Sequence, residues 1–149
     1  MTIQERLTED LGVSMKAGDT AKTSLLRLLR SAMKNEEIRV GHPLSDDEAL
    51  KVLQREAKQR RDSIDQYRTA GRTELAAAEE AELVLIQGYL PQLMDESELA
   101  AVIDEVITEQ GATQPAQMGA VIGAVMQRVG ARAEGGVVSR LVKERLSAS

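Results

Sequence analysis

The chain has 149 residues, 42% of them hydrophobic, and a formal net charge of −5. It has no cysteine, which excludes disulfides, thiol catalysis and zinc-finger chemistry. It also has no Phe or Trp and only two Tyr, so it lacks the aromatic side chains on which single-stranded RNA bases stack. A contact with RNA would therefore involve its phosphate groups and its overall shape. The core has to be built from Leu, Val, Ile, Met and Ala, which favours close-packed helices over sheets.

Helix signals begin at the N-terminus, and strand signals are missing throughout. Thr2 and Glu5 form a capping box for a first helix, which we expect to end at Gly18. Asp19 is placed to cap a second helix that extends towards Gly41.

A second capping box predicts a long third helix. It consists of Ser45 and Glu48, and the helix should run to about Ala70. Thr73 then begins a fourth helix, which closes before Pro91.

Three shorter helices follow. Asp95 caps the first of them and Gly111 ends it. Pro115 suits the first turn of the next, and a last helix begins near Val137. The sequence therefore predicts an all-α fold.

The segment around residues 91–94 is the best candidate for a domain boundary. We expect a four-helix N-terminal domain over residues 1–92 and a small three-helix C-terminal domain over residues 93–149. Within the latter, the four-residue spacing of Gly119 and Gly123 favours a close approach of two helices. Residues 1–10 lack the pattern of a secretory signal, and no apolar stretch approaches the roughly 20 residues of a membrane span. These features predict a cytoplasmic protein that is not inserted in a membrane.

The third predicted helix carries the most informative pattern, K-Q-R-R-D-S-I-D-Q-Y-R-T-A-G-R-T-E-L from Lys58 to Leu75. On a helical wheel Arg60 lies in the middle of the apolar stripe, which suggests a structural or partner-binding role, for instance an ion pair with a carboxylate in residues 79–82. Arg61, Arg68 and Arg72 line up along the edge of that stripe, and together with Lys58 from the same helix they make up the candidate basic ridge.

Two interpretations of this ridge stay open. Asp65 lies four residues after Arg61 and three before Arg68, so a salt-bridged solvent face is the simpler one. The alternative is phosphate docking, because guanidinium groups make bidentate contacts to phosphate oxygens. A second, C-terminal contact would come from Arg128, Arg132 and Lys143.

Signals for catalysis are weak. The single histidine, His42, stands in a Gly-His-Pro loop without a nucleophile beside it, and no glycine-rich phosphate cradle is present. Adjacent carboxylates on one helix do not face each other. The sequence therefore predicts no catalytic residues, no metal and no cofactor.

The motifs K-Q-R-R-D-S-I-D-Q-Y-R-T-A-G-R, E-L-V-L-I-Q-G-Y-L-P, M-G-A-V-I-G-A-V-M and R-A-E-G occur in this order and together resemble the GatB/YqeY family. A similar module forms the tail of the B subunit of glutamine-dependent aspartyl/glutamyl-tRNA amidotransferase. The resemblance implies an all-helical fold and a role in holding tRNA, whereas an amidotransferase or carbon–nitrogen ligase label belongs to the larger complex. The chain departs from the family pattern at Ala131 and Glu134, where Gly and Asp are usual, which puts a role of this turn in RNA contact in doubt.

From the ridge and the resemblance we expect a non-catalytic, tRNA-associated module. The alternative is a protein–protein adaptor, in which the same arginines pair with an acidic partner such as an amidotransferase or a synthetase. The two hypotheses differ in one test, because nuclease treatment would disrupt an RNA-bridged association and spare a protein-only one.

Overall fold

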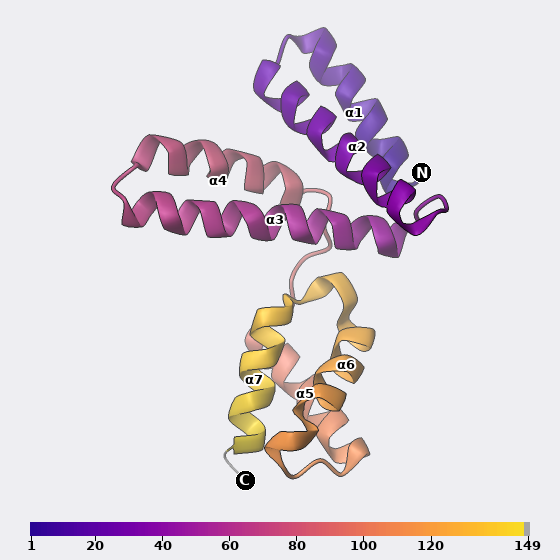
Figure 1. Cartoon of the computed structure of the whole chain (residues 1–149), viewed down its shortest axis with the longest axis vertical. Coiled ribbons are helices and arrows are strands. Elements are labelled where there is room, and N and C mark those ends of the chain that lie inside the picture. The colour runs from indigo at the N-terminus through magenta and orange to yellow at the C-terminus, as the bar shows by residue number, and fades with distance from the viewer. Residues whose placement is uncertain (148–149) are drawn as a thin grey trace. The chain divides into compact units, whose positions relative to one another are not determined.

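The computed structural model describes residues 1–147. These residues form α-helices and two short 3-10 helices and contain no strand, which confirms the all-α prediction. The chain divides into two compact units, Met1–Leu90 and Pro91–Ser149, which are described separately (Figure 1). The helices of the first unit are α1 (Ile3–Ala17), α2 (Thr20–Val40), α3 (Asp46–Thr69) and α4 (Thr73–Gln87).

Local capping sets the helix starts in the first unit. The Thr2 side chain accepts a hydrogen bond from the Glu5 backbone N–H while Glu5 reaches back to the Thr2 N–H, and Ser45 and Glu48 repeat this capping box at α3. The Asp19 side chain caps α2 by accepting from the Lys22 N–H. These bonds satisfy backbone donors that have no partner inside the helix, so the starts of all three helices follow from the sequence.

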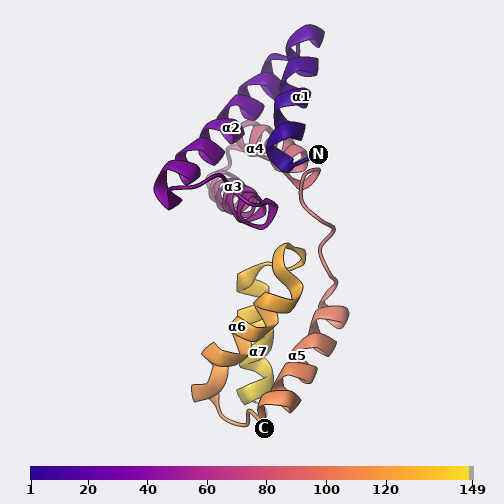
Figure 2. The ribbon, with the colours of Figure 1, turned by 90° about the vertical axis from the view of Figure 1, so that its right-hand side faces the viewer.

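Two antiparallel hairpins make up the first unit, as Figure 2 shows for α1–α2 and Figure 1 for α3–α4. Their shared apolar core joins α1 and α2 to the first half of α3 and to the end of α4. Its fully buried members include Leu7, Leu26, Leu29, Leu53 and Ile86. The core therefore fixes α1 and α2 against only one end of the α3–α4 hairpin.

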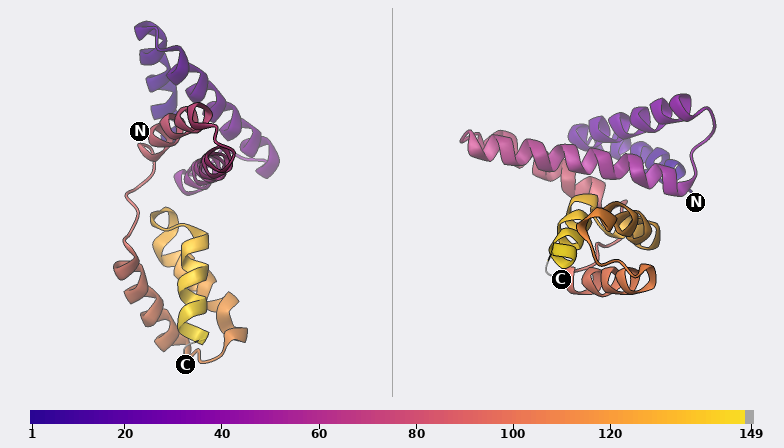
Figure 3. Two further views of the ribbon diagram at one scale, coloured as in Figure 1. Left: turned by 90° about the vertical axis from the view of Figure 1, so that its left-hand side faces the viewer. Right: turned by 60° about the horizontal axis from the view of Figure 1, so that its bottom comes forward.

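The other half of the α3–α4 hairpin projects beyond α1 and α2 (Figures 1 and 3). Its buried apolar side chains, Ile64 and Ala76, lie outside the main core cluster. Gly71, with φ of +73°, makes the tight turn between the two helices, a left-handed conformation that favours glycine. Ion pairs between α3 and α4 accompany these two apolar side chains in the projecting arm.

The second unit contains α5 (Glu96–Gln110), η1 (Pro115–Gln117), α6 (Met118–Val129), η2 (Gly130–Arg132) and α7 (Gly135–Ser147), drawn in orange to yellow in Figure 3. These helices enclose their own apolar core, which includes Ile103, Val121, Val125 and Val138. The Met94 backbone N–H donates to the Arg132 carbonyl at 2.8 Å, which ties the segment before α5 to η2.

One packing prediction for this unit is wrong. Gly119 and Gly123 are exposed, and a Cβ built on either residue would have no atom within 4 Å. The spacing therefore does not mark a close helix–helix approach, because it falls on the outer face of α6. Among residues 1–147, no helix combines the length and the apolar character that a membrane span needs.

Candidate nucleic-acid interface

Arg60 is buried and bonded to two carboxylates. Its side chain is 8% exposed, and its Nη1 lies 2.6 Å from Glu56 Oε2 on the preceding turn of α3. Its Nε lies 3.3 Å from Glu82 Oε2 on α4. A buried guanidinium needs such partners because an unpaired charge in the interior is strongly unfavourable. Arg60 thus connects α3 to α4 where the projecting arm leaves the core.

The ridge cations near Arg60 are also engaged within the protein. Arg68 pairs with Glu80 on α4, and Lys58 Nζ lies 3.8 Å from Asp62 Oδ2 one turn away. Arg61 is partly buried and is not free either. A phosphate that bound Lys58 or Arg68 would have to replace a carboxylate that is already in place.

Arg72 does not lie on α3, contrary to the wheel that aligned it with Arg61 and Arg68. The helix ends at Thr69, and after the left-handed turn at Gly71 Arg72 occupies the position before α4. Its backbone N–H donates to the Tyr67 carbonyl at 2.7 Å. Arg72 is exposed, and within residues 1–147 its side chain has no carboxylate partner.

The C-terminal candidates are in mixed states. Arg128 on α6 pairs with Glu109 and approaches Glu105 at 3.6 Å, both on α5. The Arg132 side chain donates to the carbonyls of Arg128 and Val129 at 3.4 Å. Lys143 is exposed on α7 and has no ion pair in the described part of the chain. All three candidates therefore lie on the second unit, but only Lys143 is exposed and, within residues 1–147, without a bonding partner.

The sequence analysis missed a group of basic residues on α2. Arg27, Arg30 and Lys34 are exposed and point away from the core face of α2, which carries Leu26 and Leu29. At about 100° per residue the three cations fall within about 60° of the helix circumference. We call this set the α2 strip. Within residues 1–147 none of its members has a carboxylate partner, and the nearest polar contact is Arg27 Nη2 to the Met15 sulfur at 3.9 Å.

The signal for the α2 strip was present in the sequence. From Thr20 to Asn35 the chain has four positive side chains and no negative one, in a protein with an excess of acidic residues. Counting charge by sign along one helix face would have found it.

An open groove of about 310 Å³ lies beside the α2 strip. It is bounded on α2 by Leu28, Ser31, Ala32 and Asn35 and on α3 by Glu56, Gln59 and Arg60. Ser31, Asn35 and Gln59 offer hydroxyl and amide groups. The groove therefore combines neutral hydrogen-bonding groups with an internal Arg60–Glu56 pair.

A buried carboxylate anchors the C-terminal end of α2. The Glu36 side chain is 8% exposed, and it is bonded to Arg39 on its own helix and to Arg55 of α3 at 2.6 Å. The hydrogen bonds from Arg39 and then Arg55 lower the pKa of Glu36. The two arginines thus stabilise the charged form and join α2 to α3.

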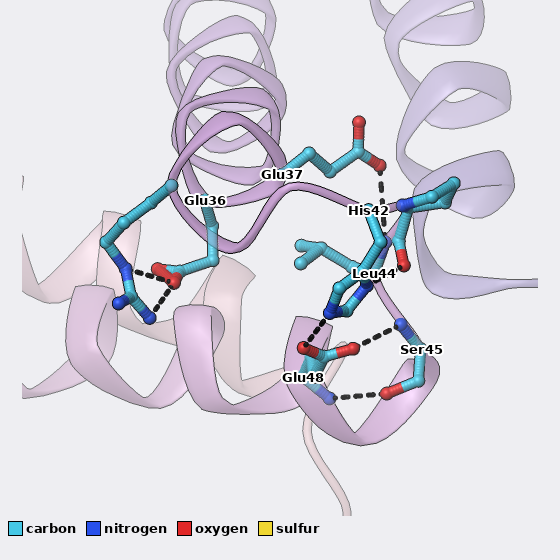
Figure 4. A network of polar contacts seen from close by, with 8 residues as sticks. Glu36, Glu37, His42, Leu44, Ser45 and Glu48 are labelled. Atoms are coloured by element: carbon cyan, nitrogen blue, oxygen red, sulfur yellow. Dashed lines mark hydrogen bonds and ion pairs between the residues drawn. The ribbon is translucent and has the colours of Figure 1, made fainter.

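The turn between α2 and α3 contains the only histidine of the chain. Figure 4 shows Glu37 accepting from the Leu44 backbone N–H, and His42 Nε2 lying 3.6 Å from a Glu48 carboxylate oxygen. Glu48 is also bonded to the Ser45 backbone N–H, which contributes most to lowering its pKa. These contacts are explained by the capping of α3 and by the turn. Within the described residues no three His, Asp or Glu side chains gather in a group that could hold a metal ion.

Comparison with known proteins places this chain in a family. Residues 4–146 match the family described as Yqey-like protein. The protein named "Altered inheritance of mitochondria protein 41, mitochondrial" of Lachancea thermotolerans is 34% identical over 112 residues, which cover 73% of this chain and 60% of the relative. The protein of the same name in Eremothecium gossypii is 36% identical over 113 residues, which cover 74% of this chain and 62% of the relative. That of Saccharomyces cerevisiae strain YJM789 is 35% identical over 94 residues, which cover 62% of this chain and 51% of the relative.

These names contradict the predicted cytoplasmic location, because the relatives are mitochondrial proteins. The prediction was wrong in its reasoning as well as its result. A missing secretory signal does not bear on mitochondrial import, which uses amphipathic, arginine-rich segments. The chain spans only about half to three fifths of the length of these relatives. The match over residues 4–146 covers nearly the whole chain, and the protein belongs to the Yqey-like family.

Proposed function

We propose that this protein is a non-catalytic helical module that associates with tRNA. The observation that carries the proposal is the family match over residues 4–146, since this family is related to the tRNA-holding tail of the amidotransferase B subunit. The cationic side chains on both units support it, because backbone contacts to nucleic acids come mainly from Arg and Lys. The amidotransferase reaction would then belong to other proteins.

The predicted contact residues do not contribute equally to this proposal. Arg72 and Lys143 are available as they stand, whereas Lys58, Arg68 and Arg128 would exchange a carboxylate for a phosphate. We also propose that the two units act as separate domains, close to the four-helix domain over residues 1–92 and the three-helix domain over residues 93–149 that the sequence predicts, and that each contributes to the contact.

The test is a titration of labelled tRNA with purified protein at low and at physiological salt. The proposal requires saturable binding that weakens with salt, because counterions are released when phosphates are neutralised. It also requires that purified protein neither hydrolyses glutamine nor transamidates charged tRNA. A failure of the wild-type protein to bind tRNA at low salt would reject the proposal.

A protein–protein adaptor is the second candidate. The exposed apolar side chains Ile38 (74%) and Val84 (68%) favour it, since protein interfaces are built around apolar anchors. An association of this kind would survive nuclease treatment of a lysate. The relatives' names refer to the inheritance of mitochondria, and an adaptor in that process is the form that this candidate takes.

A further inference from the structure

We infer that the α2 strip is the surface through which the first unit contacts the phosphate backbone of a folded RNA. The inference rests on the proposed tRNA association, and it assigns that contact to Arg27, Arg30 and Lys34 in place of the engaged α3 cations Lys58, Arg61 and Arg68. It goes beyond the sequence-based candidates, none of which lies on α2.

The cations of the α2 strip are free to bind phosphate, whereas the engaged cations of α3 are not. The α3 cations Arg60 and Arg68 already bind carboxylates of α4, so their charge is largely neutralised inside the protein. Within residues 1–147, no carboxylate lies within ion-pair distance of Arg27, Arg30 or Lys34. Only unpaired cations exchange small counterions for phosphates without first breaking an internal bond.

The second argument is that the α2 strip is unfavourable for the isolated protein. Arg27 and Arg30 are three residues apart, and Arg30 and Lys34 are four apart, so like charges face each other on the helix surface. Acidic residues at neighbouring positions would relieve this repulsion, as Glu80 does for Arg68. A local arrangement that disfavours folding without a compensating contact is typical of a functional site.

The side chains around the α2 strip fit a nucleic acid better than an acidic protein. Ser24, Ser31 and Asn35 lie beside the α2 strip, and Gln59 lies across the groove. Hydroxyl and amide side chains of this kind, together with Arg and Lys, are the usual donors to phosphate and sugar oxygens. An acidic protein partner would also pair with the cations, but its interface would need a central apolar anchor. Two exposed apolar side chains lie near the α2 strip, but neither lies between its cations: Leu28 (44% exposed) borders the groove, about 100° around the helix from Arg27, and Ile38 lies beyond Lys34.

The geometry fits a backbone contact. Seven residues separate Arg27 from Lys34, which at 1.5 Å per residue is about 10 Å along the axis. Three long, flexible side chains over this length can contact successive phosphates of one strand. The chain lacks Phe and Trp, so the contact would follow RNA shape and not stack on its bases.

The test compares two variants that each remove three positive charges. The first is Arg27→Ala/Arg30→Ala/Lys34→Ala, and the matched control is Lys58→Ala/Arg61→Ala/Arg68→Ala, which removes three cations that are engaged within the protein. A third variant, Arg27→Lys/Arg30→Lys, keeps the charge of the α2 strip. Each is titrated into labelled tRNA at about 50 mM salt after circular dichroism has shown an unchanged helical content. The same proteins are titrated with poly-L-glutamate as the probe for an acidic protein partner.

We expect the α2 variant to bind tRNA roughly 10- to 50-fold more weakly than wild type, as the loss of about three phosphate contacts implies. The control should lose less than about threefold, and the lysine variant should stay close to wild type. An α2 variant that binds as well as wild type, or a loss no greater than that of the control, would overturn the inference while leaving tRNA association intact. Loss of poly-L-glutamate binding with unchanged tRNA binding would overturn it in favour of an acidic protein. A wild type that binds no tRNA would reject both proposals.

Discussion

The cations of α3 and α2 are in opposite states, although the two helices lie in the same unit. On α3, Arg60 and Arg68 bond to Glu82 and Glu80 and so connect α3 to α4 in the projecting arm, where the apolar core does not reach. On α2, the three cations of the α2 strip are exposed and have no carboxylate partner in the described structure. A count of arginines therefore does not locate a phosphate site, because what matters is whether the charge is already neutralised.

The largest difference should appear when the structural cation is removed. Arg60→Met keeps much of the apolar stem but leaves Glu56 without its buried partner, so we expect the free energy of unfolding to fall by about 2–3 kcal/mol. The value lies below that of a fully buried pair because Glu82 is 41% exposed and regains water. Arg30→Met, the matched change on the α2 strip, should cost less than about 0.5 kcal/mol.

Tyrosine fluorescence during urea unfolding measures this in the intact protein. Both tyrosines, Tyr67 and Tyr89, lie in the first unit, so their signal reports that unit alone. Equal and small losses at Arg60 and Arg30 would show that the buried pair contributes no more than an exposed side chain, and the comparison between α3 and α2 would fail.

The second effect is the loss of the stabilising contribution of Glu36 at acidic pH. The pKa of Glu36 is lowered from 4.5 by Arg39 and Arg55, so below about pH 4.5 the unfolded chain binds more protons at this residue than the folded one. Its stabilising contribution is complete above pH 4.5 and is lost as pH falls through the folded pKa. Glu36→Gln should therefore be less stable than wild type at pH 6, and the difference should shrink as pH falls below 4.5.

Glu9→Gln is the control for that experiment. It removes the same charge from the exposed surface of α1, where within residues 1–147 Glu9 has no ion pair. A difference between Glu36→Gln and wild type that stays constant from pH 6 to pH 3 would contradict the role of the Glu36 pair in joining α2 to α3.

A third variant leaves an α3 cation without a carboxylate partner, as the cations of the α2 strip are. Glu80→Gln frees Arg68 from its carboxylate, so tRNA affinity should rise about two- to fivefold at low salt. The loss of stability should stay below about 1 kcal/mol because both side chains are largely exposed. Glu74→Gln removes one negative charge from the same helix without freeing an arginine and should raise affinity less. Equal gains would mean that net charge, and not a free Arg68, limits binding.

The smallest effect is on the stability of α2 itself. Arg30→Gln removes the repulsion of Arg30 with its two like-charged neighbours on the helix face, Arg27 and Lys34. We therefore expect stability to be unchanged or to rise by about 0.2–0.5 kcal/mol per relieved pair. Thermal unfolding at low salt should show this, and added salt should reduce the gain by screening the repulsion. A clear loss of stability would show that Arg30 makes a structural contact.

The helix starts could be predicted because capping is local. Thr2, Asp19 and Ser45 each act on a backbone N–H three residues away, a relation written directly in the sequence. Packing was less accessible. Met15 follows Leu7 and Leu11 at four-residue spacing, which places it on the apolar face of α1, yet it is 53% exposed. Ser14 is buried instead and pairs with Thr23 at 2.9 Å. Which side of a helix its neighbour covers depends on tertiary contacts that periodicity does not contain.

In the candidate site, too, local features could be predicted from the sequence and tertiary contacts could not. The sequence placed Arg60 on the apolar stripe, but whether Arg68 finds Glu80 depends on the register of α3 against α4. The position of Arg72 could have been predicted, since Gly71 breaks the helix on which the wheel still counted it. The α2 strip lies outside the densest run of arginines, and its sequence signal is the segment 20–35, which carries four positive side chains and no carboxylate.

The measurement that tests the account most directly is the salt dependence of tRNA binding by the wild type and by the Arg27→Ala/Arg30→Ala/Lys34→Ala variant. Each neutralised phosphate contributes about 0.7–0.9 to the slope of log K against log salt. We expect a wild-type slope of about −3 or steeper, and a variant slope shallower by about 2–3. Equal slopes for the two proteins would contradict it, because the α2 strip would then release no counterions when RNA binds.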